Sequence, residues 1–228
     1  MGIGIIVGSD FQGWEKLSSP EMVKTPQGTV PVFSWKNFSI IQRHGEHHSI
    51  PPHAIDYHAN LLAFKQLGIS SVVGCSSVGS LKEFIPPGSI IIPDDFISLS
   101  SRATIFDKET IHIIPHLDRE LRGRIIAAAK KARVEVKEKG VYFQTLGPRL
   151  ETKAEIRMIK QFADVVGMTM GSEATIAQEL GLKYISICKV ANFAHGIGEE
   201  KLNFQVIRDN AKKNREDLLK IIDAVEGL

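Results

Sequence analysis

The chain has 228 residues, of which 43% are hydrophobic and 24% charged, and its formal net charge is +2. This composition excludes a disordered chain, a collagen-like repeat and a disulfide scaffold, and we expect one domain over residues 1–228. The small net charge argues against nucleic acid and membrane lipid as partners. No apolar segment reaches the ~18 residues of a membrane span and the N-terminus lacks a signal pattern, so we expect a cytoplasmic protein.

Apolar runs alternate with amphipathic stretches along the whole chain. Short apolar runs that end in Gly, Ser or charged residues predict buried strands over 4–7, 39–42, 70–75, 89–93, 141–144, 165–168 and 184–190. Helical spacing with capping and stop residues predicts helices over 52–67, 118–140, 151–162, 172–180 and 204–225. The stretch 20–31, which contains Pro and Gly, indicates a surface loop or a hairpin.

Strands and helices that alternate in this way are typical of an α/β protein. We expect a single-domain three-layer sandwich, in which helices flank both faces of a mixed, largely parallel central sheet. Ligands in such folds bind beyond the carboxyl ends of the strands, so the residues that follow each strand are candidates for a site.

Several polar residues follow the predicted strands. Arg43 offers a planar fork for phosphate oxygens, and hydroxyl groups and free backbone N–H groups can complete an oxyanion pocket. Neither a Walker loop nor a GxGxxG sequence is present. The residues that converge on this edge are Ser9, Arg43, His44, His48, Ser76, Ser77, Glu151, Met168, Thr169 and Asn192.

Two further clusters could suggest a metal. Five histidines lie between His44 and His58, but no HExxH sequence and no acidic or Cys partners at ligand spacing accompany them. We therefore interpret them as pocket lining and helix surface, and we expect no metal. Cys75 and Cys188 lie in apolar runs without CxxC spacing, which predicts two buried, reduced thiols.

Three blocks of sequence resemble the trimeric purine nucleoside phosphorylase and 5′-methylthioadenosine phosphorylase family. The longest is QRHGEHHSIPPHAIDYHANLLAFKQLGISSVVGCSSVGSL over residues 42–81. The other two are TLGPRLETKAE over 145–155 and GMTMGSEATIA over 167–177. The resemblance covers nearly the whole chain and implies a nucleoside phosphorylase-like fold.

The resemblance also implies an enzymatic activity, a pentosyl transfer. Members of the family carry out reversible phosphorolysis, in which a purine nucleoside and phosphate give the free base and ribose 1-phosphate through an oxocarbenium-like transition state. Phosphate is a co-substrate and no cofactor is implied. By position, the phosphate ligands are expected to be Ser9, Arg43, His44, Thr169 and the backbone at Ser77.

The base pocket carries the clearest implication of the resemblance. Members that use 6-oxopurines have a Glu facing N1–H and an Asn at O6 and N7, whereas members that release adenine have Ser and Asp there. This chain has Glu151 and Asn192, which together with His44 are the expected catalytic residues. A carboxylate facing N1 requires an N–H on the base, so we expect 6-oxopurine nucleosides as substrates. Glu151 could also be a helix N-terminal carboxylate.

The sugar end is implied in less detail. Met168 is expected against the ribose and Leu150 where the family usually has Phe, while His48, Phe204 and a neighbouring subunit's His112 are expected at the 5′ pocket. An apolar Phe204 keeps 5′-methylthioinosine beside inosine and guanosine as a substrate. The family forms homotrimers or homohexamers in which a neighbour completes each site. A 5′-methylthioadenosine phosphorylase, a hydrolase and a non-catalytic nucleoside-binding protein are the alternatives.

Overall fold

A computed structural model of the chain describes residues 2–11, 13, 14, 16–100, 103–106, 108–198 and 215–225. Its centre is a mixed ten-stranded sheet. The strands are β1 (Ile3–Val7), β2 (Glu21–Thr25), β3 (Gly28–Trp35), β4 (Phe38–Gln42), β5 (Ser71–Ser80), β6 (Ile90–Ile91), β7 (Asp95–Ile97), β8 (Val141–Gln144), β9 (Val165–Gly167) and β10 (Lys183–Phe193).

The middle of the sheet is parallel and its margins are mixed. Strand β1 pairs in parallel with β4 and β5, and β10 continues the sheet in parallel with β5. Strands β2 and β3 form an antiparallel hairpin that continues into β4, so the stretch 20–31 is a hairpin. Strands β7, β8 and β9 are parallel to one another, and β9 joins the end of β5 in the antiparallel sense.

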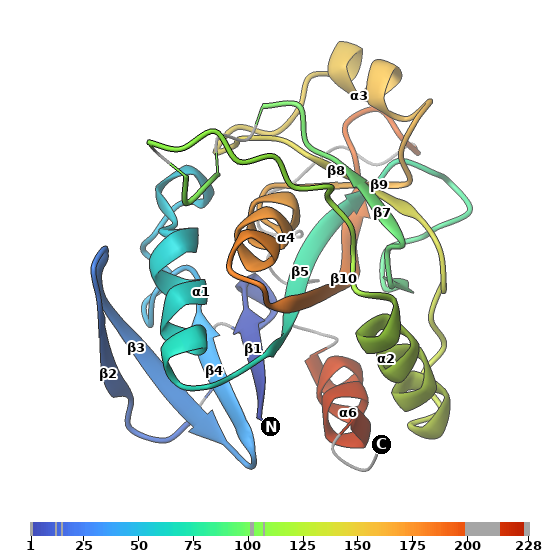
Figure 1. Cartoon of the computed structure of the whole chain (residues 1–228). Helices are drawn as coiled ribbons and strands as arrows, with labels where there is room; N and C mark the ends of the chain where they lie inside the picture. Colours follow the sequence, from blue (N-terminus) through green and yellow to red (C-terminus); the bar gives the residue numbers. More distant parts are fainter. Residues whose placement is uncertain are drawn as a thin grey trace.

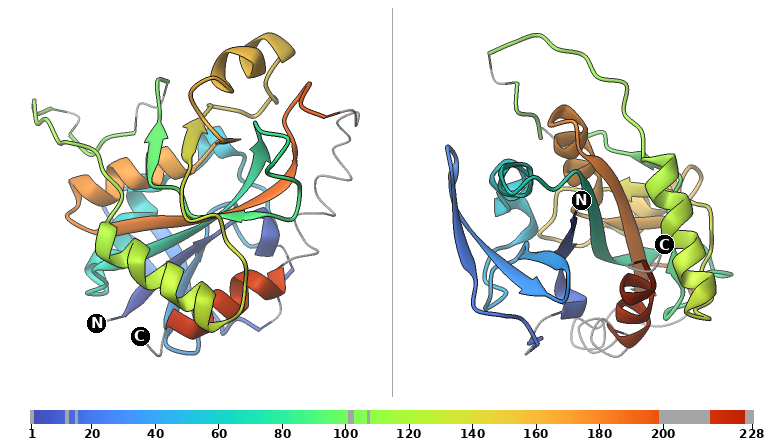
Figure 2. Two further views of the ribbon diagram at one scale, coloured as in Figure 1. Left: turned by 90° about the vertical axis from the view of Figure 1, so that its right-hand side faces the viewer. Right: turned by 60° about the horizontal axis from the view of Figure 1, so that its bottom comes forward.

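Helices cover both faces of this sheet, which confirms the expected three-layer α/β architecture (Figures 1 and 2). Helices α1 (Tyr57–Gln66) and α4 (Met170–Glu179) pack together on one side. Helices α2 (Arg119–Lys131) and α6 (Arg215–Val225) pack together on the other. Helix α3 (Lys153–Ile159) lies at the β8–β9 end of the molecule, where its buried face contributes to a second, smaller apolar cluster.

The two longest strands extend further than their apolar runs predict. Strand β5 runs to Ser80 and β10 to Phe193, so Ser76, Ser77 and Asn192 lie within strands, not after them. The reason is pairing: β5 and β10 stay in register from Ser71 opposite Lys183 to Ser80 opposite Phe193, with one irregularity before Asn192. Backbone hydrogen bonds between neighbours therefore extend both strands through polar residues.

Several helix boundaries also differ from the predictions. The helix expected from residue 52 begins at Tyr57, because Asp56 caps it and Pro52–Ala54 form a separate 3-10 turn, η2. Helix α2 stops at Lys131, and Arg133 follows in the left-handed region with φ 57°. Helix α3 is shorter than 151–162 at both ends. Of the helix expected over 204–225, only α6 lies within the described residues.

The start of α4 is also different from its prediction. The sequence predicts a helix that begins at residue 172, but the helix begins at Met170 with Thr169 as its N-cap residue. Ser172 instead bonds Gln144: the Gln144 amide nitrogen lies 2.6 Å from the Ser172 hydroxyl, and the Ser172 backbone N–H donates to Gln144 Oε1 at 3.0 Å. This earlier start places Thr169 at the end of β9, facing the carboxyl edge of the sheet.

Candidate functional site

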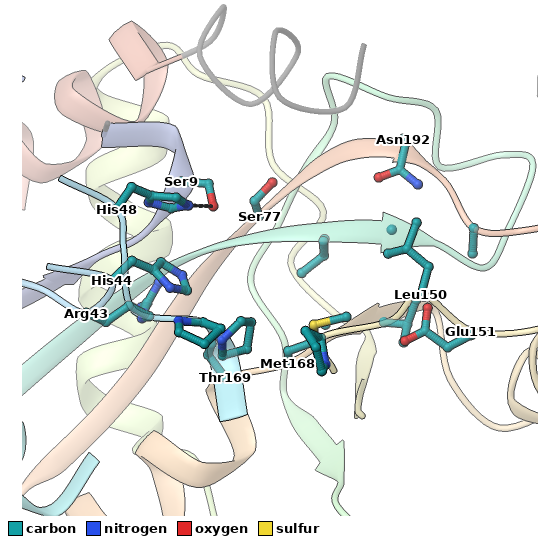
Figure 3. Close-up of a pocket in the computed structure, with 18 of the residues that line it drawn as sticks. Ser9, Arg43, His44, His48, Ser77, Leu150, Glu151, Met168, Thr169 and Asn192 are labelled. Atoms are coloured by element: carbon teal, nitrogen blue, oxygen red, sulfur yellow. Dashed lines mark hydrogen bonds between the residues drawn. The ribbon is translucent and has the colours of Figure 1, made fainter. Parts of the chain in front are cut away.

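A cavity of about 400 Å³ lies at the carboxyl edge of the central strands (Figure 3). The short 3-10 turn η1 (Ser9–Phe11) follows β1 there, and the segments after β4, β8 and β9 approach from other sides. The cavity brings together most of the residues predicted from sequence: Ser9, Arg43, His44, His48, Ser77, Leu150, Glu151, Met168, Thr169 and Asn192.

One end of the cavity is built on a buried ion pair. The Arg43 Nε lies 2.6 Å from Glu173 Oε1, and its Nη2 donates to Glu173 Oε2 at 3.2 Å. Tyr184 donates its hydroxyl to the same Oε2 at 2.6 Å. Burial alone would lower the pKa of Arg43, but Glu173 outweighs this and raises the pKa, so the guanidinium stays charged.

This pairing corrects one expectation about Arg43. The planar fork expected for phosphate is occupied by Glu173, and further N–H groups donate to the carbonyl oxygens of Cys75 and Ile6. A guanidinium has five N–H groups, so one N–H, on Nη1, keeps no partner among the described residues. Arg43 therefore offers a single donor and its charge, and Glu173 holds the guanidinium in place.

His44 stands beside Arg43 as a neutral acceptor. Its Nδ1 lies 2.8 Å from the Ile50 carbonyl oxygen. A carbonyl can only accept, so Nδ1 carries the proton and Nε2 has a free lone pair. Burial and, to a smaller extent, the nearby charge of Arg43 lower the pKa of His44 to about 3, so the ring is neutral at pH 7. His44 can thus accept a hydrogen bond from a hydroxyl group or from a protonated phosphate oxygen.

Two hydroxyl groups complete this end. The Ser9 hydroxyl lies 3.4 Å from His48 Nε2, and the rings of His48 and His44 are in tilted contact with centroids 4.5 Å apart. The Thr169 side chain makes no capping bond to α4. The backbone N–H groups of Thr169 and Met170 donate to the buried Tyr142 hydroxyl. The Thr169 hydroxyl is therefore available to a ligand, while Tyr142 fixes the backbone that presents it.

The other end of the cavity presents a carboxylate and an amide. Thr145 donates to Glu151 Oε1 at 2.7 Å, which leaves Oε2 as a free acceptor on a side chain that is 8% exposed. The Asn192 amide nitrogen donates to the Phe193 carbonyl at 2.7 Å and keeps a second N–H and its own carbonyl oxygen. His195, which sequence analysis did not single out, lines the same end with Nδ1 3.1 Å from the Glu151 carbonyl oxygen.

Glu151 does not serve the helix that follows it. Thr152 and Glu155 form a reciprocal capping box at the start of α3, and Arg149 pairs with Glu155 at 2.7 Å. These bonds lower the pKa of Glu155 to about 2. Because Glu155 already supplies the carboxylate of the first turn, the alternative of Glu151 as a helix-terminal carboxylate is not supported. The Glu151 side chain faces the cavity with Leu150 and Met168 (Figure 3).

Two predicted residues lie elsewhere. His112 is exposed in the segment between β7 and α2 and does not line the cavity of its own chain. Phe204 lies outside the described residues.

Cys75 and Cys188 are free thiols, and burial raises the pKa of Cys188 to about 12. Among the described residues, no three His, Cys, Asp or Glu side chains could hold a metal ion, and no described helix could cross a membrane.

The structure adds functional residues that sequence reasoning missed. Glu173 lies within the block at 167–177, but its role depends on Arg43, which is 130 positions away in the chain. Tyr142 and Tyr184 look like ordinary strand aromatics in the sequence. Their hydroxyl groups matter only because folding places one under Thr169 and the other on Glu173.

The cavity therefore has two chemically different ends. One end offers a cation, hydroxyl groups and a neutral imidazole, which suits a small oxyanion that carries or meets a hydroxyl group. The other offers a carboxylate acceptor and an amide that can both donate and accept, which suits a heterocycle with N–H and C=O groups at its edge. Apolar side chains, including Met168 and Val166, line the space between them.

Comparisons with known proteins identify the family. The model of the phosphorylase superfamily matches residues 3–225. A probable 6-oxopurine nucleoside phosphorylase of Archaeoglobus fulgidus is 45% identical over 97% of this chain and 94% of its own. A probable S-methyl-5′-thioinosine phosphorylase of Methanocaldococcus jannaschii is 36% identical over 97% and 90%. The structure of a methylthioadenosine phosphorylase from Schistosoma mansoni with adenine superimposes with a TM-score of 0.88 at 25% identity, covering 99% of this chain and 91% of the other.

Proposed function

The chain belongs to the phosphorylase superfamily, and on that basis we propose that it catalyses the reversible phosphorolysis of 6-oxopurine nucleosides to the free base and a pentose 1-phosphate. Inosine, guanosine and 5′-methylthioinosine are the candidate substrates. The observation that carries this proposal is the free Glu151 Oε2 at one end of a cavity whose other end holds Arg43, His44 and Thr169.

The proposed phosphate site is formed by Ser9, Arg43, His44, Thr169 and the backbone at Ser77. Arg43 supplies one N–H and a fixed charge, the hydroxyl groups of Ser9 and Thr169 donate hydrogen bonds, and His44 accepts a hydrogen bond from the phosphate O–H or from a sugar hydroxyl. The dianion attacks the anomeric carbon as the bond to N9 breaks. Catalysis consists of holding phosphate close to an oxocarbenium-like sugar, which is a matter of position and electrostatics. Met168 would pack against the ribose.

The leaving purine would be stabilised at the opposite end. Glu151 Oε2 accepts the N1–H of a 6-oxopurine, and the Asn192 amide donates to N7 as negative charge develops on the ring. Adenine has no N1–H and would place its own lone pair against the carboxylate. A buried acceptor left without its donor costs binding energy, so the site discriminates against 6-aminopurines.

A second copy of the chain is proposed to complete each site, as a homotrimer or homohexamer. Leu99 and Ile114, on either side of His112, are 80% and 87% exposed, and Leu150 at the cavity mouth is 38% exposed. We propose that the neighbouring copy covers these apolar side chains. His112 of a neighbour, with His48 and Phe204, would then form the 5′ pocket.

The remaining parts of the proposal concern domain organisation, cofactors, biological role and ligands. We propose a single domain over residues 1–228, no cofactor besides the co-substrate phosphate, and a role in purine salvage in the cytoplasm. Purine nucleosides and phosphate are the proposed ligands, without nucleic acid or membrane as partners.

A panel of nucleosides, assayed with and without phosphate, tests the function. Inosine, guanosine and 5′-methylthioinosine should release base only when phosphate is present, and adenosine and 5′-methylthioadenosine should react far more slowly. Faster release of adenine would favour a 5′-methylthioadenosine phosphorylase. Equal release without phosphate would indicate a hydrolase, and binding without turnover a nucleoside-binding protein. Light scattering after gel filtration measures the oligomeric state.

A further inference from the structure

Asp10 is a buried carboxylate that the proposed reaction does not use. It follows Ser9 in the turn η1, its side chain is fully buried, and neither carboxylate oxygen has a hydrogen-bond partner among the described residues. Burying an unsatisfied carboxylate is costly, and such a group in a native structure calls for an explanation. Asp10 directly follows Ser9, a proposed phosphate ligand.

The turn that carries Asp10 lies directly on the Arg43 guanidinium. A Cβ atom at Gly8 would come within 2.4 Å of Arg43 Nη1, so only glycine allows this approach. Lys189 of β10 is the other cation that acts on Asp10; it is 1% exposed and lies opposite Ser77 of β5 in the parallel register. Of the proposed phosphate ligands, Ser9 is thus next to Asp10 in sequence, and Ser77 lies opposite Lys189 in register.

The other titratable groups around Asp10 are few. The thiols of Cys75 on β5 and Cys188 on β10 also feel its charge, and burial keeps both thiols protonated. His44 and His48 line a small cavity with Gly8 at the edge of the turn, and His44 is neutral. Asp217 of α6 acts on Lys189 from the far side. The charge of ionised Asp10 therefore interacts mainly with the charges of Lys189 and Arg43.

Arg43 and Lys189 are the two cations whose charges act on Asp10; Arg43 is ion-paired with Glu173, and the charge of Asp217 also acts on Lys189. Protonating Asp10 removes one negative charge from this buried group of residues. A phosphate dianion on Ser9 would be repelled by ionised Asp10 through a region of low dielectric constant, and this repulsion disappears when Asp10 is neutral.

We propose that Asp10 is a positioning residue of the phosphate subsite, and that it takes up one proton from solvent when phosphate binds and returns it when the product leaves. This inference rests on the proposed function, because it takes the Ser9 end of the cavity as the phosphate subsite. Burial raises the pKa of Asp10 to about 7, while Lys189 and Arg43 oppose the rise, so its protonation state changes near neutral pH.

The test compares wild type with Asp10→Asn, which has the same shape and stays neutral at every pH. KM for phosphate should agree within about twofold at pH 6, and at pH 8 it should be about tenfold higher in wild type than in the variant. A parallel pH profile for KM in both proteins would overturn the proposal. A merely structural role for Asp10 would change stability or kcat without this divergence in the KM profile.

A calorimetric measurement on wild type alone covers the case in which the variant does not fold. Sulfate serves as a dianion that carries no proton, and its binding at pH 8 is measured in two buffers of different ionisation enthalpy. Uptake of about one proton per site supports the proposal, and no uptake overturns it. If no proton is taken up but wild type still cleaves inosine in a phosphate-dependent way, the inference about Asp10 fails and the proposed function stands. If wild type binds no phosphate at all, both the inference and the proposed function fail.

Discussion

The two ends of the cavity are held in place in different ways. At the phosphate end, Arg43, Glu173 and Tyr184 are buried, and Arg43 bonds Glu173 across 130 positions of the chain. At the base end, Thr145, Glu151 and the capping box of α3 lie within a few positions of one another, and Leu150 is partly exposed. The fold as a whole therefore fixes the anion site, whereas at the purine site a local segment holds Glu151, and Asn192 and His195 come from the end of β10 and the segment after it.

Arg43→Ala should have the largest effect. We expect a loss of about 10³-fold in kcat/KM for phosphate, because the only fixed cation lining the cavity among the described residues is removed. The same change leaves Glu173 buried and unpaired, which should also lower the free energy of unfolding by about 3–5 kcal/mol. Steady-state kinetics and urea denaturation measure the two effects.

A double variant separates these two roles. Arg43→Met with Glu173→Gln removes both charges, so it should recover much of the lost stability without recovering activity. Full activity in Arg43→Ala would show that phosphate binds elsewhere.

Glu151→Gln tests the base end. We expect about a 10- to 100-fold fall in kcat/KM for inosine, because a charged hydrogen bond to N1–H is replaced by a weaker one. KM for phosphate should stay nearly unchanged, since Glu151 lies at the opposite end of the cavity (Figure 3). Glu155→Gln is the matched control: it neutralises a carboxylate in the same segment that faces the capping box, and nucleoside selectivity should not change. A fall of equal size in both variants would contradict the assignment of Glu151.

The pH dependence of stability tests the neutral imidazole at the phosphate end. His44 has a lowered pKa of about 3 in the folded chain against an ordinary value of 6.5, so below pH 6.5 the unfolded chain binds a proton that the folded chain does not. Stability from this group is therefore present above pH 6.5 and is lost as the pH falls towards 3. Between pH 7 and 5, wild type should lose about 2 kcal/mol more than His44→Gln. Equal losses in thermal or urea unfolding would mean that His44 is protonated in the folded state.

The sequence predicted which polar residues follow the strands better than it predicted the hydrogen bonds and ion pairs that hold those residues in place. Arg43, Thr169 and Glu151 follow their strands as expected, because apolar runs and their polar ends are local patterns. The pairing of Arg43 with Glu173 could not be predicted, because the two residues are 130 positions apart and the local sequence around each one gives no sign of the other. Resemblance identified the segment that contains Glu173 but gave it no role.

The ends of strands and helices were predicted poorly where contacts with a neighbouring element decide them. Ser76 and Asn192 were expected after their strands, but pairing between β5 and β10 keeps both within the sheet. Ser172 looks like a cap in sequence, yet Gln144 engages it and leaves Thr169 as the N-cap residue. Local propensity is a weak guide at such positions, because tertiary hydrogen bonds override it.

Thr152→Ala should have the smallest effect and sharpens the contrast between the two ends. The Thr152 side chain accepts the Glu155 backbone N–H at 3.2 Å, and its loss should cost about 1 kcal/mol of stability. Because Glu151 directly precedes Thr152, loosening this turn should weaken the hydrogen bond from Glu151 to the base. A partial loss of one hydrogen bond should raise KM for inosine by about twofold to fivefold. KM for phosphate should not change, since no bond of α3 reaches the Arg43 network among the described residues. Equal changes in both constants would show that the two ends are coupled, and the purine site would then depend on the whole fold as the anion site does.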